Sequence, residues 1–137
     1  MKKQRQQLRQ SMNSRAPTFP PIPHDGSSNI VIREILLSFW KVHILHHAAE
    51  KPIYGQWIAV ELRRHGYHIN PGTLYPLLKR MEGHGWLKCV PVHKSHTKSR
   101  REYRLTSEGA RILSLICELV QELYQEVVKE GAGRYHR

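Results

Sequence analysis

The spacing of hydrophobic residues predicts a short amphipathic helix over residues 70–83. Its apolar residues fall at positions i, i+3, i+4 and i+7, which is one stripe of an α-helix: Leu74, Leu77, Leu78 and Met81. Asn70 suits the N-cap and Pro71 the first helical position, where a missing N–H costs nothing. Pro76 cannot donate a backbone hydrogen bond, so we expect kinked first turns or a helix that starts nearer Thr73.

The opposite face of this helix is small near its start and basic further along. It carries Gly72, Thr73, Tyr75, Pro76, Lys79 and Arg80, with Glu82 at its margin. A helix that is buried on one side and basic on the other is typical of a DNA-reading helix. An ordinary amphipathic surface helix would show the same stripe, so this stretch alone leaves both interpretations open.

The hydrophobic pattern predicts further elements on both sides of this helix. Residues 30–49 are apolar nearly all round, which predicts a helix that is central in its domain or buried against a second chain. Residues 54–65 read as a second amphipathic helix. Beyond the central helix the period changes to two, which predicts strands at residues 87–92 and 101–105 with a polar, basic hairpin tip at residues 93–99.

A long last helix is predicted from its N-cap, Thr106, to about residue 130. Gly109 stands where a capping box would have an acid. Five apolar residues of this helix are spaced 3, 4, 3, 4, as in a coiled-coil seam: Leu113, Ile116, Val120, Leu123 and Val127. We expect this seam, with Leu36 and Trp40 of the first helix, to form a dimer interface, while another part of the stripe covers its own domain.

This order of elements predicts a mainly α (α+β) fold, a winged helix-turn-helix with a long C-terminal dimerisation helix. The winged-helix DNA-binding domain would span residues 30–105, the dimerisation helix residues 106–130 and a tail residues 131–137. Residues 1–29 combine basic residues, Gln and Pro, a composition typical of a disordered arm. The alternative is an arm that adds phosphate contacts or folds onto a partner.

The positive charge is concentrated in the arm and the front of the domain. The chain of 137 residues has a net charge of +11. Residues 1–104 hold 18 Lys and Arg against 6 Asp and Glu, whereas residues 105–137 hold 4 against 5. Localised positive charge favours a polyanion, either nucleic acid or an anionic membrane.

The sequence has two Cys, no secretory signal and no apolar run of the ~18 residues that span a membrane, so we expect a cytoplasmic protein that does not insert into membranes.

Two segments together resemble the PadR-like family of transcriptional regulators. Pro71–Leu87 is similar to the family's recognition-helix motif, and Arg101–Gly109 is similar to its second wing strand and the start of its last helix. Tyr54–Ile58 resembles the entry to its second helix. The resemblance covers roughly residues 30–128 and implies a homodimeric winged-helix repressor. The sequence departs from the family in its longer arm, in a tip at residues 93–99 without Gly or Pro, and in a last helix without the Trp that lines a drug pocket in some relatives.

The resemblance and the basic pattern together predict two sets of DNA contacts. Lys79 and Arg80 would contact bases or phosphates, since Arg is the commonest reader of guanine. Tyr75 would reach a phosphate or a thymine methyl group, and three further residues would permit close backbone approach: Gly72, Thr73 and Pro76. In the wing, Lys94, Lys98, Arg100 and Arg101 would contact phosphate or the minor groove, the alternative being a solvated loop.

Three histidines, His43, His46 and His47, share one helix with i, i+3 and i+4 spacing. With one more ligand they could hold a metal, and zinc- or nickel-dependent DNA affinity would follow. No Cys or carboxylate stands in a matching local motif, so we expect a polar strip and no metal site. Cys89 and Cys117 have apolar neighbours in the sequence, so we expect buried, inert thiols.

The sequence shows no catalytic pattern, since it lacks a GxSxG motif, a phosphate-binding Gly loop and a recognisable Ser/His/Asp order. We therefore expect a non-enzyme, a sequence-specific repressor whose partners are double-stranded DNA and a second copy of the chain. No cofactor is expected, although a small hydrophobic or phenolic effector could bind near Trp40 and Trp57 at the dimer interface. Two alternatives stay open: an architectural or plasmid-related nucleic-acid-binding module, and a winged-helix adaptor that binds protein.

Overall fold

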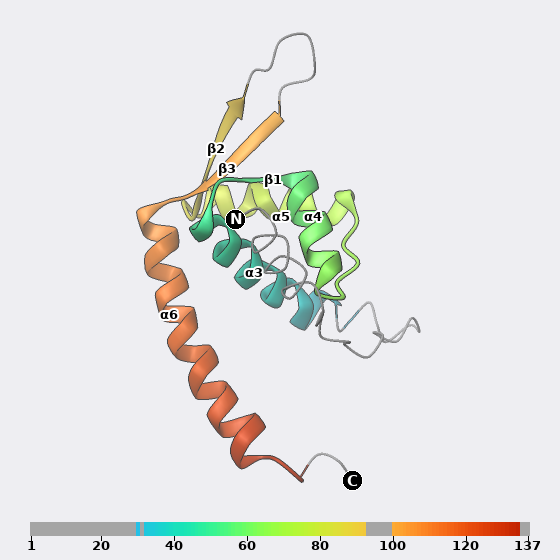
Figure 1. Cartoon of the computed structure of the whole chain (residues 1–137), viewed down its shortest axis with the longest axis vertical. Helices are drawn as coiled ribbons and strands as arrows, with labels where there is room; N and C mark the ends of the chain where they lie inside the picture. The colour runs from blue at the N-terminus through green and yellow to red at the C-terminus, as the bar shows by residue number, and fades with distance from the viewer. Residues whose placement is uncertain (1–29, 31, 93–99, 135–137) are drawn as a thin grey trace, which may run out of the picture.

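A computed structural model of the protein describes residue 30, residues 32–92 and residues 100–134. The elements in these ranges are η1 (Ile32–Leu36), α3 (Leu37–Glu50), β1 (Ile53–Tyr54), α4 (Gly55–Arg64), α5 (Pro71–Gly83), β2 (Leu87–Val92), β3 (Arg100–Leu105), α6 (Ser107–Leu123) and η2 (Tyr124–Glu130), where η marks a π-helical segment. The predicted winged helix with a long last helix is confirmed (Figure 1). The predicted arm at residues 1–29 and wing tip at residues 93–99 lie outside the described residues.

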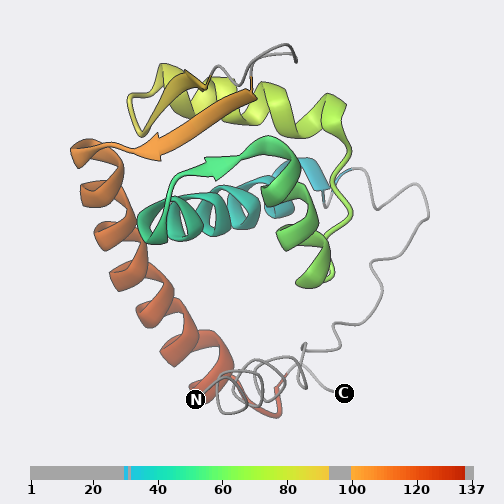
Figure 2. The ribbon, with the colours of Figure 1, turned by 45° about the horizontal axis from the view of Figure 1, so that its top comes forward.

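Helix α3 lies at the centre of the domain and contacts α4, α6 and β3, while α5 runs along the top of Figure 2 and contacts β2. One continuous core joins these elements. Its buried members are Leu36, Trp40, Ile44, Leu45, Ala48, Ile53, Ile58, Leu62, Ile69, Leu74, Leu77, Leu78, Met81, Leu87 and Tyr103. None of the helices in the described part of the chain has the length and apolar character needed to cross a membrane.

Helix α5 begins where its cap predicts. The side-chain Oδ1 of Asn70 accepts a hydrogen bond of 2.9 Å from the backbone N–H of Thr73, and Pro71 is the first helical residue. The alternative start nearer Thr73 is therefore wrong. Pro76 lies inside the helix and leaves the carbonyl of Gly72 without its usual N–H donor, but Gly72 is exposed, so this carbonyl is on the water side. The four predicted stripe residues are buried.

The wing is part of a three-stranded sheet with the order β1-β3-β2, where the sequence predicted two strands. The antiparallel pairing of β2 with β3 runs from Leu87 opposite Leu105 to Val92 opposite Arg100. The additional strand β1 has two residues and pairs Ile53 with Tyr103. A strand this short has no alternation to detect, which is why the pattern did not predict it.

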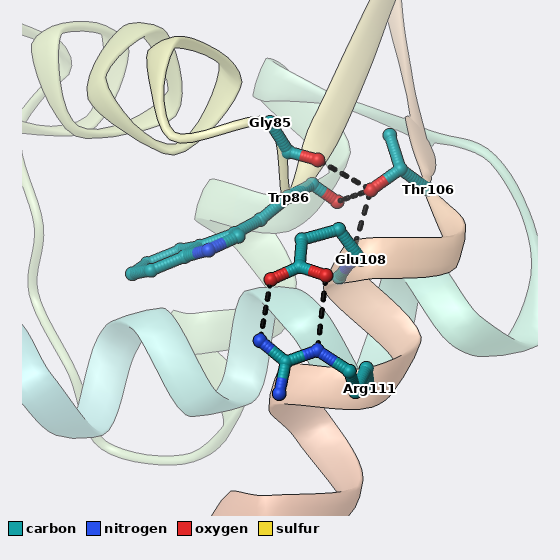
Figure 3. Close-up of polar contacts among 6 residues, drawn as sticks. Gly85, Trp86, Thr106, Glu108 and Arg111 are labelled. Atoms are coloured by element: carbon teal, nitrogen blue, oxygen red, sulfur yellow. Dashed lines mark hydrogen bonds and ion pairs between the residues drawn. The ribbon is translucent and has the colours of Figure 1, made fainter.

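Helix α6 starts directly on the base of the wing (Figure 3). The hydroxyl of Thr106 accepts a hydrogen bond of 2.9 Å from the N–H of Gly109 and donates to the carbonyl of Gly85, while the N–H of Thr106 donates to the carbonyl of Trp86 at 3.1 Å. A Cβ atom on Gly109 would overlap the Trp86 carbonyl oxygen and lie 2.7 Å from Cδ1 of Leu105. This crowding explains why a glycine replaces the usual acid of the capping box.

The two ends of α6 differ in their environment. Leu113 and Ile116 are half-buried against the core, whereas Val120, Leu123 and Val127 are exposed. Figure 1 shows the far half of this helix leaving the rest of the domain. The regular α-helix ends at Leu123 and continues as η2 to Glu130, which is where the sequence predicted the helical end.

The burial of three residues bears on the roles predicted for them. Trp40 and Leu36 are 3% and 9% exposed in the chain's own core, so they offer little surface to a second copy. Their exposed neighbours Ile35 and Phe39 offer more. The prediction of a buried Cys117 is wrong, because this thiol is exposed on α6. Cys117 is exposed because α6 extends away from the core beyond Ile116, and its next residue, Glu118, is a charged one.

Candidate nucleic-acid interface

The solvent side of α5 presents the residues that were predicted to contact DNA. Tyr75 is 43% exposed, and Gly72, Pro76, Lys79 and Arg80 are also exposed, with Thr73 half-buried. We call these six residues the basic face of α5. They adjoin one another around the helix because the buried stripe occupies the other side.

Tyr75 rests on the first residue of the neighbouring helix. A Cβ atom built on Gly55 would lie 2.6 Å from Cε1 of Tyr75 and 3.0 Å from its hydroxyl oxygen. Glycine at the start of α4 therefore lets the tyrosine ring lie against the backbone of α4. This contact holds the two helices of the helix-turn-helix together on the exposed side. The signal was present in the sequence as a glycine after Tyr54, but its partner could not be identified without the fold.

A groove separates the Arg80 side of α5 from the start of the first helical segment. Its volume is about 790 Å³. It is lined by Gly72, Thr73, Pro76 and Arg80 of α5 and by Ile30, Arg33, Glu34 and Leu37. Tyr75 and Lys79 are not part of this lining. The basic face thus has one edge beside this groove and one edge beside α4.

The wing contributes cations on both sides of its sheet. Arg101 is exposed at the start of β3, and Lys88 and Arg104 are exposed opposite each other in the β2–β3 register. Because residues alternate between faces along a strand, Arg101 and Arg104 face opposite sides. Arg100 is the first residue of β3, and the predicted contacts Lys94 and Lys98 lie outside the described residues. Four further exposed cations were not predicted as DNA contacts: Lys88, Arg104, and the pair Arg63 and Arg64 at the end of α4.

Glu102 partly neutralises this wing and ties it to β1. Its Oε1 accepts a hydrogen bond of 2.6 Å from Nε of Arg104, and its Oε2 accepts one of 3.1 Å from the hydroxyl of Tyr54. The hydrogen bond from Arg104 is the main cause that lowers the pKa of Glu102, and the bond from Tyr54 adds to it. Glu102 is thus a carboxylate that joins β1 to the central strand.

Comparisons with known proteins agree with this architecture. The family model described as "Transcriptional regulator PadR-like family" matches residues 44–115 of this chain. The chain is 40% identical over 97 residues to the transcriptional regulator Rv3488 of Mycobacterium tuberculosis. This alignment covers 71% of this chain and 90% of that protein.

Two solved structures show the same fold at somewhat lower sequence identity. A PadR-like transcription factor from Bacteroides fragilis is 26% identical with a TM-score of 0.66, covering 74% of this chain and 98% of that one. A transcriptional regulator from Clostridium thermocellum is 30% identical with a TM-score of 0.61, covering 74% and 97%. The family match spans α5, the wing and the start of α6, which are the elements described above, and the chain belongs to the PadR-like family of transcriptional regulators.

Proposed function

We propose that this protein is a homodimeric repressor that binds a specific DNA site through the basic face of α5. The observation that carries the proposal is the division of α5 into a fully buried stripe and an exposed face with Lys79 and Arg80. A helix held in this way can enter the major groove as a rigid body. Side chains such as Arg80 can then contact base edges there.

The wing would hold the protein on the DNA backbone. Lys88 is an exposed cation on β2, which contacts α5, and Arg101 is an exposed cation on the neighbouring strand β3. Contacts from such cations to phosphate fix orientation and contribute affinity for every sequence. Sequence specificity would therefore come from α5, whereas the wing would contribute affinity that falls as the salt concentration rises.

Dimerisation would use the seam on α6 and the groove between α3 and α6. The exposed apolar residues of this region include Ile35, Phe39, Val120, Leu123 and Val127, each between 41% and 51% exposed. A mainly apolar groove of about 920 Å³ lies between the two helices. A second copy's α6 is the occupant that fits the coiled-coil spacing best, since it would present the same seam.

Two copies related by a twofold axis would place their α5 helices in successive major grooves of a roughly palindromic site. The apolar groove between α3 and α6 could also admit a small hydrophobic or phenolic effector in the dimer, although neither Trp40 nor Trp57, near which the sequence predicted it, lines this groove. A DNA-binding regulator with two free cysteines, Cys89 and Cys117, is consistent with the cytoplasm, where thiols stay reduced.

The first test is binding of the purified protein to the DNA upstream of its own gene, compared with scrambled DNA of equal length across a salt series. We expect the upstream DNA to be preferred at about 0.15 M salt, where non-specific binding is weak. Equal binding to both DNAs that falls steeply with salt would support an architectural module. Little binding to either DNA would support a protein-binding adaptor.

Single substitutions test the roles of α5 and the wing. Arg80→Ala should weaken DNA binding and relax the preference for one sequence. Lys98→Ala should weaken binding to all DNA sequences alike, and it should reduce the slope of log K against log salt concentration by about 1. Arg111→Ala removes the same charge from the exposed surface of α6, where Arg111 pairs with Glu108, and serves as the control. The proposal fails if Arg80→Ala and Lys98→Ala bind like the parent.

A further inference from the structure

The fold brings a third histidine to the helix that carries the His43–His47 pair. His65 directly follows α4, and one ring nitrogen from each of His43, His47 and His65 lies within 4.8 Å of the other two. The ring centroids of His43 and His65 are 4.9 Å apart, and those of His47 and His65 are 5.9 Å apart. We call these three residues the histidine cluster. It joins α3 to the turn that leads into α5.

His47 is buried without the hydrogen bonds that an imidazole needs. The residue is 7% exposed, and within the described part of the chain neither ring nitrogen has a hydrogen-bond partner. Nδ1 lies 3.5 Å from Oε2 of Glu50, too far for a good hydrogen bond. Buried polar atoms are normally paired, and leaving one unpaired costs free energy. The ring nitrogens of His47 are therefore available to a ligand atom that enters the cluster.

Two of the three histidines, His43 and His47, have lowered pKa values. Burial, together with the charges of His65, His47 and His46, lowers the pKa of His43 to about 4. Burial also lowers the pKa of His47, against the attraction of Glu61 and Glu50. Both imidazoles are therefore neutral near pH 7, with a lone pair available on each ring. A neutral imidazole is the form that binds a metal ion.

We propose that His43, His47 and His65 form a binding site for a divalent transition-metal ion of the zinc, nickel or cobalt type. Three imidazoles suit these metals, whereas magnesium and calcium prefer oxygen ligands. Nitrogens that bind zinc at about 2.1 Å in a tetrahedron lie about 3.4 Å apart. The cluster therefore needs to contract by up to about 1.4 Å, which small side-chain rotations can supply.

Glu61 is placed to complete or support the site. Its Oε1 lies 3.6 Å from Nε2 of His65, and its side chain is only 14% exposed. The negative charge of the same carboxylate raises the pKa of His43 and of His47, against the larger effect of burial. It currently pairs with Arg64 at 3.1 Å. Glu61 could bind the metal as a fourth ligand or accept a hydrogen bond from the ring N–H of His65.

A second grouping on α3 shares His47 but is less suited to a metal. It consists of His46, His47 and Glu50, and the side chains of His46 and Glu50 are 58% and 55% exposed. These two residues already form an i,i+4 pair at 3.2 Å on the open helix surface. The histidine cluster draws on two elements and is more enclosed, so we assign the metal to it.

A metal at this site would fix the end of α4 against α3. His65 is followed by the short turn that ends at Asn70, the cap of α5. The ion would thus restrain the helix-turn-helix from the side opposite the wing. This inference goes beyond the proposed DNA binding, and it is tested by metal titration without DNA. Its failure would leave the repressor proposal untouched.

The experiment uses the untagged full chain, freed of metal with a chelator that is then removed. Zinc is titrated in competition with a chromophoric chelator, and cobalt(II) binding is followed through its visible absorption bands. We expect one high-affinity zinc per chain, cobalt bands typical of four- or five-fold coordination, and a higher Tm with one equivalent of zinc, because the ion binds the folded state.

Variants distinguish this site from other histidines. His65→Ala, at a half-exposed position after α4, should weaken zinc binding at least about tenfold and abolish the zinc-dependent rise in Tm. His43→Ala should do the same. Far-UV circular dichroism of each metal-free variant establishes that it is folded. His84→Ala removes an exposed histidine at the end of α5 and should bind zinc like the parent.

Three results would overturn the proposal. The first is a parent protein that takes up no zinc at 100-fold excess of metal. The second is a folded His65→Ala variant whose affinity for zinc equals that of the parent. The third is a His46→Ala variant that loses as much affinity for zinc as His65→Ala does, because the metal would then belong to the exposed grouping on α3.

Discussion

Gly109 occupies a position where the structure leaves no room for a side chain. Its N–H donates to the cap residue Thr106, and the space where its Cβ would stand is filled by the carbonyl of Trp86 and by Leu105. The base of the wing and the start of α6 therefore approach each other closely at this one residue. The neighbouring pair Glu108 and Arg111 adds an exposed ion pair at 2.6 Å (Figure 3), a contact of the kind that contributes little to stability.

Gly109→Ala should lower the free energy of unfolding by about 2–4 kcal/mol, because the clash is with backbone and cannot be relieved by a side-chain rotation. Urea denaturation followed by circular dichroism measures this loss. Gly83→Ala is the matched control, since a Cβ atom at Gly83 meets nothing within 4 Å. That variant should stay within about 1 kcal/mol of the parent. Equal stability of the two variants would contradict the close approach at Gly109.

The stabilising effect of Glu102 should be lost at acid pH. Its pKa is lowered in the folded protein from an ordinary value of 4.5, so its contribution to stability is complete above that value and is lost as the pH falls through the folded pKa. The Tm difference between the parent and Glu102→Gln should be largest at pH 7 and shrink below about pH 4.5. Glu118→Gln, an exposed change of the same charge on α6, is the control. A Tm difference that does not depend on pH would contradict the role of the Arg104 hydrogen bond.

At the scale of elements, one contact fixes how α4 and α5 pack against each other. It lies on the side of α5 that we propose faces DNA. The ring of Tyr75 lies on Gly55, where any larger residue would displace it. Both residues belong to segments that carried the family resemblance, at residues 54–58 and 71–87. Their pairing gives a physical reason for a glycine at the start of α4.

Gly55→Ala should therefore weaken specific DNA binding by about tenfold, since misplacing one contact costs on the order of 1–2 kcal/mol. The measurement is fluorescence anisotropy with the preferred DNA. In a Tyr75→Ala background the same Gly55→Ala change should have almost no further effect, because the clash is gone. Additive losses in the double variant would show that Gly55 acts on binding by another route.

The sequence predicted the elements that carry a regular pattern. The stripe, cap and end of α5 were all visible in residues 70–83, and the alternation of β2 and β3 was visible as well. Strand β1 was not predicted because its two residues acquire meaning only from pairing with β3. His65 was missed for the same kind of reason, since it meets His43 only after α4 packs on α3.

At the scale of the whole molecule, α6 is the element that the single chain does not bury. Seven of its large apolar residues, including those of η2, are more than 40% exposed: Leu115, Leu119, Val120, Leu123, Tyr124, Val127 and Val128. The first half of the helix packs on α3, and the second half extends beyond the domain (Figure 2). A continuous apolar surface of this kind marks an interaction site.

Introducing charge into this surface should prevent dimerisation. The parent should have a mass in solution of twice the 16.1 kDa of the chain, and the double variant Val120→Glu/Leu123→Glu should have the mass of one chain, because buried unpaired carboxylates are costly. Light scattering after size exclusion gives these masses. Ser114→Glu adds a charge to the opposite side of α6 and should leave the dimer intact. A parent protein that is already a monomer would refute the proposed interface.

No flexible linker separates the wing from α6: β3 ends at Leu105, Thr106 is the cap, and Ser107 is the first helical residue. A rotation of α6 would therefore move the wing with it and, through the contact of β2 with α5, would move α5 as well. In a dimer joined along α6, the crossing angle of the two helices would set the distance between the two reading surfaces. The preferred number of base pairs between operator half-sites would then report on the dimer interface itself, and a compound bound between α3 and α6 would act by changing that preferred spacing.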